Sequence, residues 1–200
     1  MGAALDGVIV TLRAHRATVG MRRWLTLALL LTLTSAAQAA PPETLHLVVQ
    51  KSERRLLLYA AQGAGPERLV KDYRIALGQQ PSGPKRDRGD GATPEGEYYV
   101  THANPKSRFH LSLGLSYPNA RDAEQGLRRG LITKAEQASI AEALAKGARP
   151  PQDTKLGGDV FVHGGGTGSD WTLGCIALAD ADIDELFARV PVRTRVTIAP

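Results

Sequence analysis

The chain has 200 residues, of which 42% are apolar and 22% are charged, and this is enough apolar material for one globular core. Its single cysteine excludes an intramolecular disulfide and any metal site built from several thiolates. The net charge of +5 favours a nucleic-acid or membrane partner only if the basic residues belong to the folded part of the chain.

The first 40 residues predict a leader for export. From Met21 the chain has two arginines, an apolar run from Trp24 to Leu33, and small residues that end in Ala-Gln-Ala at 37–39. This pattern is typical of a cleavable signal peptide, and the apolar run is shorter than the ~20 residues of a spanning helix. We therefore expect residues 1–20 to be an extension upstream of the true start, residues 21–40 a signal peptide, and residues 41–200 one exported domain.

Removal of the leader changes the meaning of the charge. Residues 41–200 hold 21 basic and 19 acidic residues, so their net charge is only +2. A nearly neutral domain gives no reason to expect binding to a polyanion. We expect no nucleic-acid partner, no stable membrane span, and a monomer.

Short strand patterns dominate the rest of the chain. Apolar residues alternate with polar ones at Leu45, Leu47 and Val49, and a second apolar run at 55–59 precedes a Gly-Pro turn, which predicts a hairpin. Further strands are expected at 69–77, 96–101, 109–113, 159–163, 175–178 and 192–198.

Two helices complete the expected fold. Thr133 and Glu136 form a capping-box pattern ahead of a helical segment that ends at Gly147, and residues 180–189 have acids at the start and an arginine at the end. Residues 115–129 are predicted to be irregular. The charged, glycine-rich segment 78–92 is predicted to be a solvated loop. The sequence predicts a mainly β fold, a sandwich or barrel that carries two or more short helices.

Cys175 and His163 are the candidate catalytic pair. A predicted strand ends at His163, and a glycine-rich loop returns the chain to Thr172-Leu173-Gly174-Cys175. A buried apolar role for the cysteine is one interpretation, but a lone thiol in an exported protein is open to oxidation and needs a reason. The backbone N–H groups of Gly174 and Cys175 could hold an oxyanion, and His163 could act as general base or pair as imidazolium with the thiolate.

Other motifs predict less. His102 and His110 have no carboxylate or thiolate at ligand spacing, so we expect no metal site. Residues 82–85 match S-x-x-K, but they contain Pro84 and lack the companion motifs of penicillin-binding enzymes. The nucleotide-binding glycine motifs do not occur, and we expect no cofactor.

Six short segments follow one another along the chain: TPEGEY at 93–98, FHLSL at 109–113, YPN at 117–119, LGG at 156–158, VHG at 162–164 and GC at 174–175. In this order they resemble the L,D-transpeptidase (YkuD-type) catalytic domain, and most closely its YafK-like branch. The resemblance covers about 45–189.

The resemblance implies a nucleophile at Cys175 and a base at His163, oriented by the Gly164 carbonyl, with Gly174 and Thr172 beside them. It also implies periplasmic action on peptidoglycan stem peptides: attack after meso-diaminopimelate, release of D-alanine, and transfer to another stem or to a lipoprotein lysine, or hydrolysis. We expect substrate contacts from a further group of residues, namely Trp171, Tyr117, Asn119 and Arg108.

Two positions depart from the family's usual [ST]-H-G-C-h-[NR] pattern. Leu173 stands at the second histidine and Ala177 at the Asn or Arg, which removes a substrate carboxylate contact. Candidate replacements are Arg74, Arg108 and Arg121. Two alternatives stay open: a non-catalytic peptidoglycan-binding or scaffold module, and a sortase-like cysteine transpeptidase.

Overall fold

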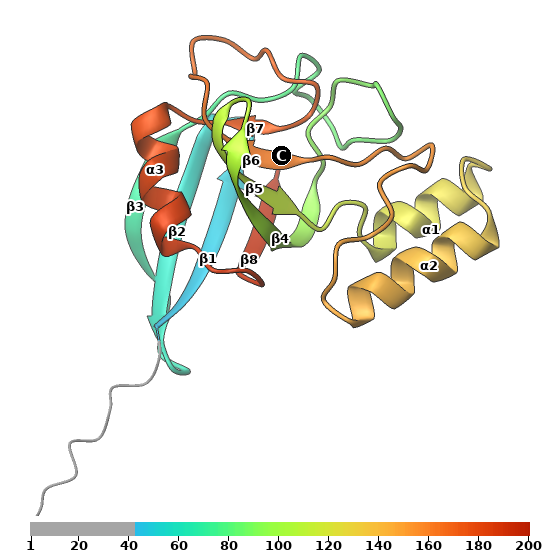
Figure 1. Cartoon of the computed structure of the whole chain (residues 1–200), viewed down its shortest axis with the longest axis horizontal. Coiled ribbons are helices and arrows are strands. Elements are labelled where there is room, and N and C mark those ends of the chain that lie inside the picture. The colour runs from blue at the N-terminus through green and yellow to red at the C-terminus, as the bar shows by residue number, and fades with distance from the viewer. Residues whose placement is uncertain (1–42) are drawn as a thin grey trace, which may run out of the picture. The chain divides into compact units, whose positions relative to one another are not determined.

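The computed structural model describes residues 43–200, so the expected extension and signal peptide at 1–40 lie outside the described part. Within that part, eight strands form one mixed sheet in the order β3-β2-β1-β8-β4-β5-β6-β7, accompanied by three helices (Figure 1). The strands are β1 (Glu43–Gln50), β2 (Arg55–Gln62), β3 (Arg68–Arg74), β4 (Gly96–Ser107), β5 (His110–Leu115), β6 (Phe161–His163), β7 (Ile176–Ala177) and β8 (Arg195–Ala199). The helices are α1 (Ala120–Arg128), α2 (Lys134–Ala145) and α3 (Asp180–Arg189).

The predicted N-terminal hairpin is confirmed. β1 pairs antiparallel with β2 along its whole length, from Glu43 opposite Gln62 to Gln50 opposite Arg55, and β8 adds to β1 in parallel. Alternate positions of these strands, among them Leu47 and Val49, are fully buried, as the period-2 pattern requires. They form one side of the main core.

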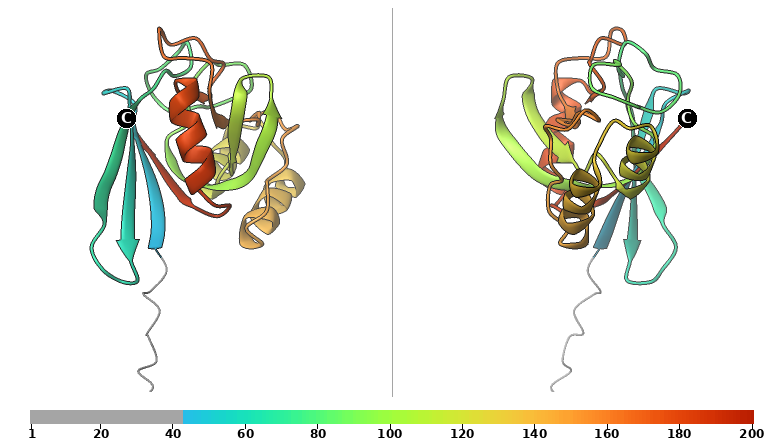
Figure 2. Two further views of the ribbon diagram at one scale, coloured as in Figure 1. Left: turned by 60° about the vertical axis from the view of Figure 1, so that its left-hand side comes forward. Right: turned by 90° about the vertical axis from the view of Figure 1, so that its right-hand side faces the viewer.

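The long strand β4 joins the two halves of the sheet. Gly96–Tyr99 pairs with β8, whereas Val100 and later residues pair with β5, and the register shifts twice along that second part. Such irregularities bend a strand, and Figure 2 shows the β4–β5 hairpin diverging from β1–β3 with α3 between them. Buried Ile183 and Leu186 of α3 join the main core. The expected mainly β fold with short helices is confirmed, and its strands form one bent sheet.

Helix α1 corrects the prediction that residues 115–129 are irregular. Asn119 and Asp122 exchange side-chain and backbone hydrogen bonds of 2.9 Å in a capping box. The helix contains Gly126, which ordinarily weakens a helical pattern, but a Cβ at this position would lie 2.6 Å from Leu156 Cδ2. Glycine therefore permits close packing of α1 on Leu156.

Helix α2 has the predicted capping box, in which Thr133 and Glu136 bond reciprocally. A second small core lies between α1, α2 and the following segment, and comprises Ala123, Ile132, Ile140 and Leu156. Over residues 43–200, no helix combines the length and apolarity needed to cross a membrane.

Candidate active site

The β6–β7 pair brings the two candidate catalytic residues to one face of the sheet. His163 ends β6, Cys175 directly precedes β7, and the strands pair in parallel with Val162 opposite Ile176. Because side chains alternate along each strand, the same register sends His163 and Cys175 to the same side. Both line an open cleft of about 830 Å³.

The loop between these strands is held by polar contacts at several points. Asp170 accepts bonds from Arg54 at 3.0 and 2.7 Å and from the Leu77 N–H at 2.9 Å. The Gly165 N–H donates to Asp180 Oδ1 at the start of α3, at 2.8 Å. The segment that carries Trp171 to Cys175 is therefore fixed to the sheet and to α3.

The imidazole of His163 is held in one tautomer. Its Nδ1 lies 2.6 Å from the Gly164 carbonyl oxygen, and because a carbonyl only accepts, Nδ1 carries the proton and Nε2 is left as the base. The ring stacks on Phe109 with the two centroids 4.7 Å apart, and it makes an edge-type contact with Trp171 at a centroid distance of 5.6 Å. Burial lowers the pKa of His163 below its ordinary value, the Gly164 carbonyl opposes this, and Arg108 adds to it.

The Cys175 thiol is protonated in this geometry. Its Sγ donates to the Asp159 carbonyl at 3.4 Å. Burial raises its pKa to about 11, with a further contribution from the Asp159 carboxylate, against opposing effects of the Phe161 backbone and the charges of Lys85 and Arg108. A neutral thiol and a neutral imidazole in one cleft favour general-base activation over a preformed thiolate–imidazolium pair.

Thr172 closes the turn ahead of Cys175. Its Oγ1 donates to the Cys175 carbonyl at 2.7 Å and accepts from the Gly174 N–H at 3.2 Å. The expected oxyanion hole from two consecutive N–H groups therefore needs correction, because Thr172 already occupies the N–H of Gly174.

The backbone conformation and the close packing at position 174 both require glycine. Its φ is +126°, and an added Cβ would lie 2.6 Å from the Ala92 carbonyl oxygen.

Gly174→Ala is expected to lower the free energy of unfolding by about 2–4 kcal/mol, because the backbone is strained and the chain around Ala92 is displaced. Urea denaturation measures this. The matched control is Gly166→Ala, with φ +99° and no atom within 4 Å of the added Cβ, for which only strain of about 1 kcal/mol is expected. Equal losses in the two variants would show that the contact with Ala92 has no effect.

Comparison with known proteins decides the family. The model of the YkuD family, described as the L,D-transpeptidase catalytic domain, matches residues 44–198. The chain belongs to this family. It is similar to the Escherichia coli K12 protein named "Putative L,D-transpeptidase YafK", with 26% identity over 144 residues, which are 71% of this chain and 45% of that protein. The chain thus spans less than half the length of the curated relatives it matches.

Solved structures share the fold of this L,D-transpeptidase domain. The helical cell shape determining protein Pgp2 from Campylobacter jejuni has a TM-score of 0.57 and 21% identity, covering 80% of this chain and 48% of Pgp2. Bd1075 from Bdellovibrio bacteriovorus has a TM-score of 0.50 and 19% identity, covering 80% of this chain and 49% of that protein.

The positions that depart from the L,D-transpeptidase motif have distinct surroundings. Leu173 lines the cleft with 75% of its surface exposed. Ala177 is fully buried in β7, where it bridges to Ala76. Of the three arginines considered as replacements, Arg108 lines the cleft, whereas Arg74 and Arg121 do not.

Two of the expected substrate contacts are corrected. Tyr117 is fully buried, and its hydroxyl donates to the Leu156 carbonyl at 3.0 Å. Asn119 caps α1 and lies outside the cleft. Both stabilise the junction between the sheet and the α1–α2 pair. Trp171 and Arg108 do line the cleft.

His110 and His102 lie outside the candidate catalytic pair and have other contacts. His110 Nε2 lies 2.7 Å from Asp184 Oδ1 on α3, and His102 packs its ring against Phe161. Among residues 43–200, no three His, Cys, Asp or Glu side chains come together in an arrangement that could hold a metal ion.

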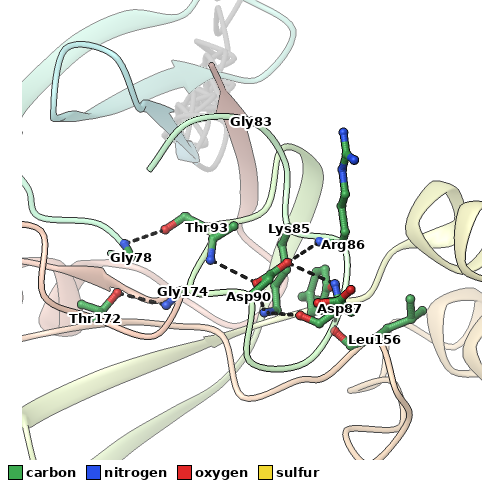
Figure 3. A network of polar contacts seen from close by, with 12 residues as sticks. Gly78, Gly83, Lys85, Arg86, Asp87, Asp90, Thr93, Leu156, Thr172 and Gly174 are labelled. Carbon is green, nitrogen blue, oxygen red and sulfur yellow. Dashed lines mark hydrogen bonds and ion pairs between the residues drawn. The ribbon is translucent and has the colours of Figure 1, made fainter. Parts of the chain in front are cut away.

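The 78–92 segment is an ordered wall of the cleft, which corrects its interpretation as a solvated loop. Lys85 is buried and pairs with Asp90 (Figure 3). Arg88 donates to the carbonyls of Gln152 and Thr154 at 2.9 and 3.2 Å. Lys85, Arg88 and Lys106 line the cleft beside Arg108, and sequence reasoning missed all three as site residues. An aspartate between two glycines, Asp90, was the available signal for an organised turn.

Proposed function

We propose that this protein cleaves an amide bond of peptidoglycan stem peptides through a thioester on Cys175. The observation that carries the proposal is the shared cleft of Cys175 and a His163 ring whose Nδ1 proton is held by Gly164. Membership of the L,D-transpeptidase family supports peptidoglycan as the substrate class.

In the first half of the reaction, Nε2 of His163 takes the proton of Sγ as the sulfur attacks the amide carbonyl carbon. The carbonyl oxygen becomes an oxyanion, for which the Cys175 N–H and the cations of the cleft are the proposed stabilising groups. Collapse of this intermediate breaks the carbon–nitrogen bond, and the imidazolium gives its proton to the leaving amine. The products of this half are a Cys175 thioester and a free amine.

In the second half, an acceptor attacks the thioester carbonyl while His163 removes a proton from the attacking atom. Sulfur leaves as the thiolate and regains its proton from the imidazolium. We propose that the bond attacked first follows meso-diaminopimelate, with D-alanine released. An acceptor amine from another stem gives a 3–3 crosslink, a lipoprotein lysine gives attachment to murein, and water gives a tripeptide.

Mass spectrometry of products tests the proposal. The protein is incubated with disaccharide-tetrapeptides, alone and with an added amine acceptor. Release of D-alanine with a crosslinked dimer indicates transfer, and release of D-alanine with a tripeptide indicates hydrolysis. Unchanged tetrapeptides under all these conditions would contradict the proposed function.

We also propose that the protein acts in the periplasm. The basis is the signal-peptide pattern at 21–40 together with the envelope location of stem peptides. The protein recovered from the envelope is expected to begin within a residue or two of Ala40. Export would be contradicted if the protein were recovered from the cytoplasm with residues 21–40 still attached.

A further inference from the structure

Lys85 is a buried cation in the wall of the cleft. Only 7% of the residue is exposed, and its Nζ donates to the Asp87 carbonyl at 3.0 Å and to Asp90 Oδ1 at 2.8 Å (Figure 3). An ammonium group has three N–H donors. Two of them therefore have oxygen acceptors within residues 43–200. The centroid of the Tyr117 ring lies 6.0 Å from Nζ, a distant contact, so the third N–H has no oxygen acceptor in this part of the chain and is left for a ligand.

Asp90 fixes the position of this ammonium group. Its carboxylate also accepts the N–H groups of Arg86 at 2.6 Å, Asp87 at 3.1 Å and Ala92 at 3.0 Å. Burial by itself raises the pKa of Asp90, but the bonds from Arg86, Lys85, Asp87 and Ala92 hold it below its ordinary value. The carboxylate thus stays ionised, and its hydrogen bond holds the Lys85 side chain in one place. A side chain that is already ordered loses little entropy when it binds a ligand.

Lys85 lies close to the nucleophile's turn. Its Nζ is 3.9 Å from the position of a Cβ built on Gly174, the residue that precedes Cys175. The other cations that line the cleft, Arg88, Lys106 and Arg108, are exposed. Asp90 balances the charge of Lys85, and the three exposed cations still outnumber the single carboxylate of the lining, Asp159. The cleft therefore attracts an anionic group, and Lys85 is its one buried cation.

We propose that Lys85 binds the α-carboxylate of the amino acid that is released from the stem peptide. This inference rests on the proposed function. That carboxylate is separated from the scissile nitrogen by a single Cα, so covalent geometry holds it next to the bond under attack. The Lys85 ammonium has a fixed position beside Gly174, and the α-carboxylate has a fixed position relative to the scissile bond.

Equilibrium binding tests the assignment. The Cys175→Ala protein is titrated with a disaccharide-tetrapeptide that ends in a free carboxylate and with its C-terminal carboxamide. The free acid is expected to bind about 10- to 100-fold more tightly, as for a hydrogen bond between charged groups. Adding Lys85→Met, or Lys85→Gln as a second variant, is expected to bring the affinities for the acid and the carboxamide within about twofold of each other. The substitution should do so by weakening the binding of the free acid alone.

A matched control separates binding from folding. Lys51 is buried at 2% exposure and pairs with Glu95 at 2.8 Å, but it lies outside the cleft. Lys51→Met removes an equally buried cation and is expected to keep the preference for the acid. If Lys85 had a purely structural role, its substitution would also leave the ratio of acid to carboxamide affinity unchanged.

The outcomes distinguish this inference from the proposed function. Equal binding of acid and carboxamide before any Lys85 substitution overturns the inference, as does absence of binding or a preference that survives Lys85→Met and Lys85→Gln. An acid preference that depends on Lys85, in a protein whose wild type does not turn over the peptide, supports the inference and contradicts the function.

Discussion

Replacing Cys175 with alanine is expected to reduce kcat/KM for stem-peptide cleavage by about 10⁴-fold or more, because no other group in the cleft can form the thioester. The measurement is the rate of D-alanine release from a disaccharide-tetrapeptide. The substitution removes only the sulfur, and Thr172 keeps its bond to the residue 175 carbonyl. Binding of the peptide should therefore persist.

The same variant separates enzyme from binding module. A non-catalytic module would show no D-alanine release in the wild type and equal peptide binding in both proteins. Release within about tenfold of wild type by Cys175→Ala would show that the thiol is not the nucleophile.

Replacing His163 with alanine is expected to lower kcat/KM by about 10²- to 10⁴-fold. The reason is the raised pKa of the thiol: at about 11, only about one thiol in 10⁴ is ionised at pH 7 without a base. The rate of Cys175 alkylation by iodoacetamide is expected to fall in parallel, which tests the base role without a substrate.

The pH profile is the control for this second prediction. The base must be neutral to accept a proton, so wild-type kcat/KM should rise with pH through the pKa of His163, which lies below its ordinary value of 6.5. His163→Ala should lack this acid limb. An acid limb that survives in the variant would assign it to another group, and His163 would then not be the base.

Local patterns predicted the strands and the proximity of the two candidate catalytic residues, because both depend on neighbouring residues. The alternation of Leu45, Leu47 and Val49 is a property of one strand, and its pairing with 55–59 needs only a short turn. His163 and Cys175 flank one loop, so the parallel pairing of β6 and β7 suffices to bring them to one face.

The missed features depend on contacts between distant segments. Helix α1 contains Gly126 in its last turn, and the compensating contact comes from Leu156, which follows later in the chain. Tyr117 matched a motif of the family, but only the fold shows its hydroxyl bonded to Leu156.

The wall of the cleft was missed for a similar reason. The charged residues of 78–92 read as solvated because nothing in the sequence shows that three backbone N–H groups converge on Asp90 and hold Lys85 inside. Charge patterning alone does not distinguish a buried ion pair from an exposed one.

Intact-mass spectrometry of the protein mixed with a disaccharide-tetrapeptide and quenched in acid tests the central claim most directly. The account predicts a transient adduct with the mass of the acyl tripeptide, mapped to Cys175 by peptide sequencing, labile to hydroxylamine and absent from Cys175→Ala. D-alanine release that proceeds with no adduct in wild type, or with an adduct at any residue other than Cys175, would contradict it.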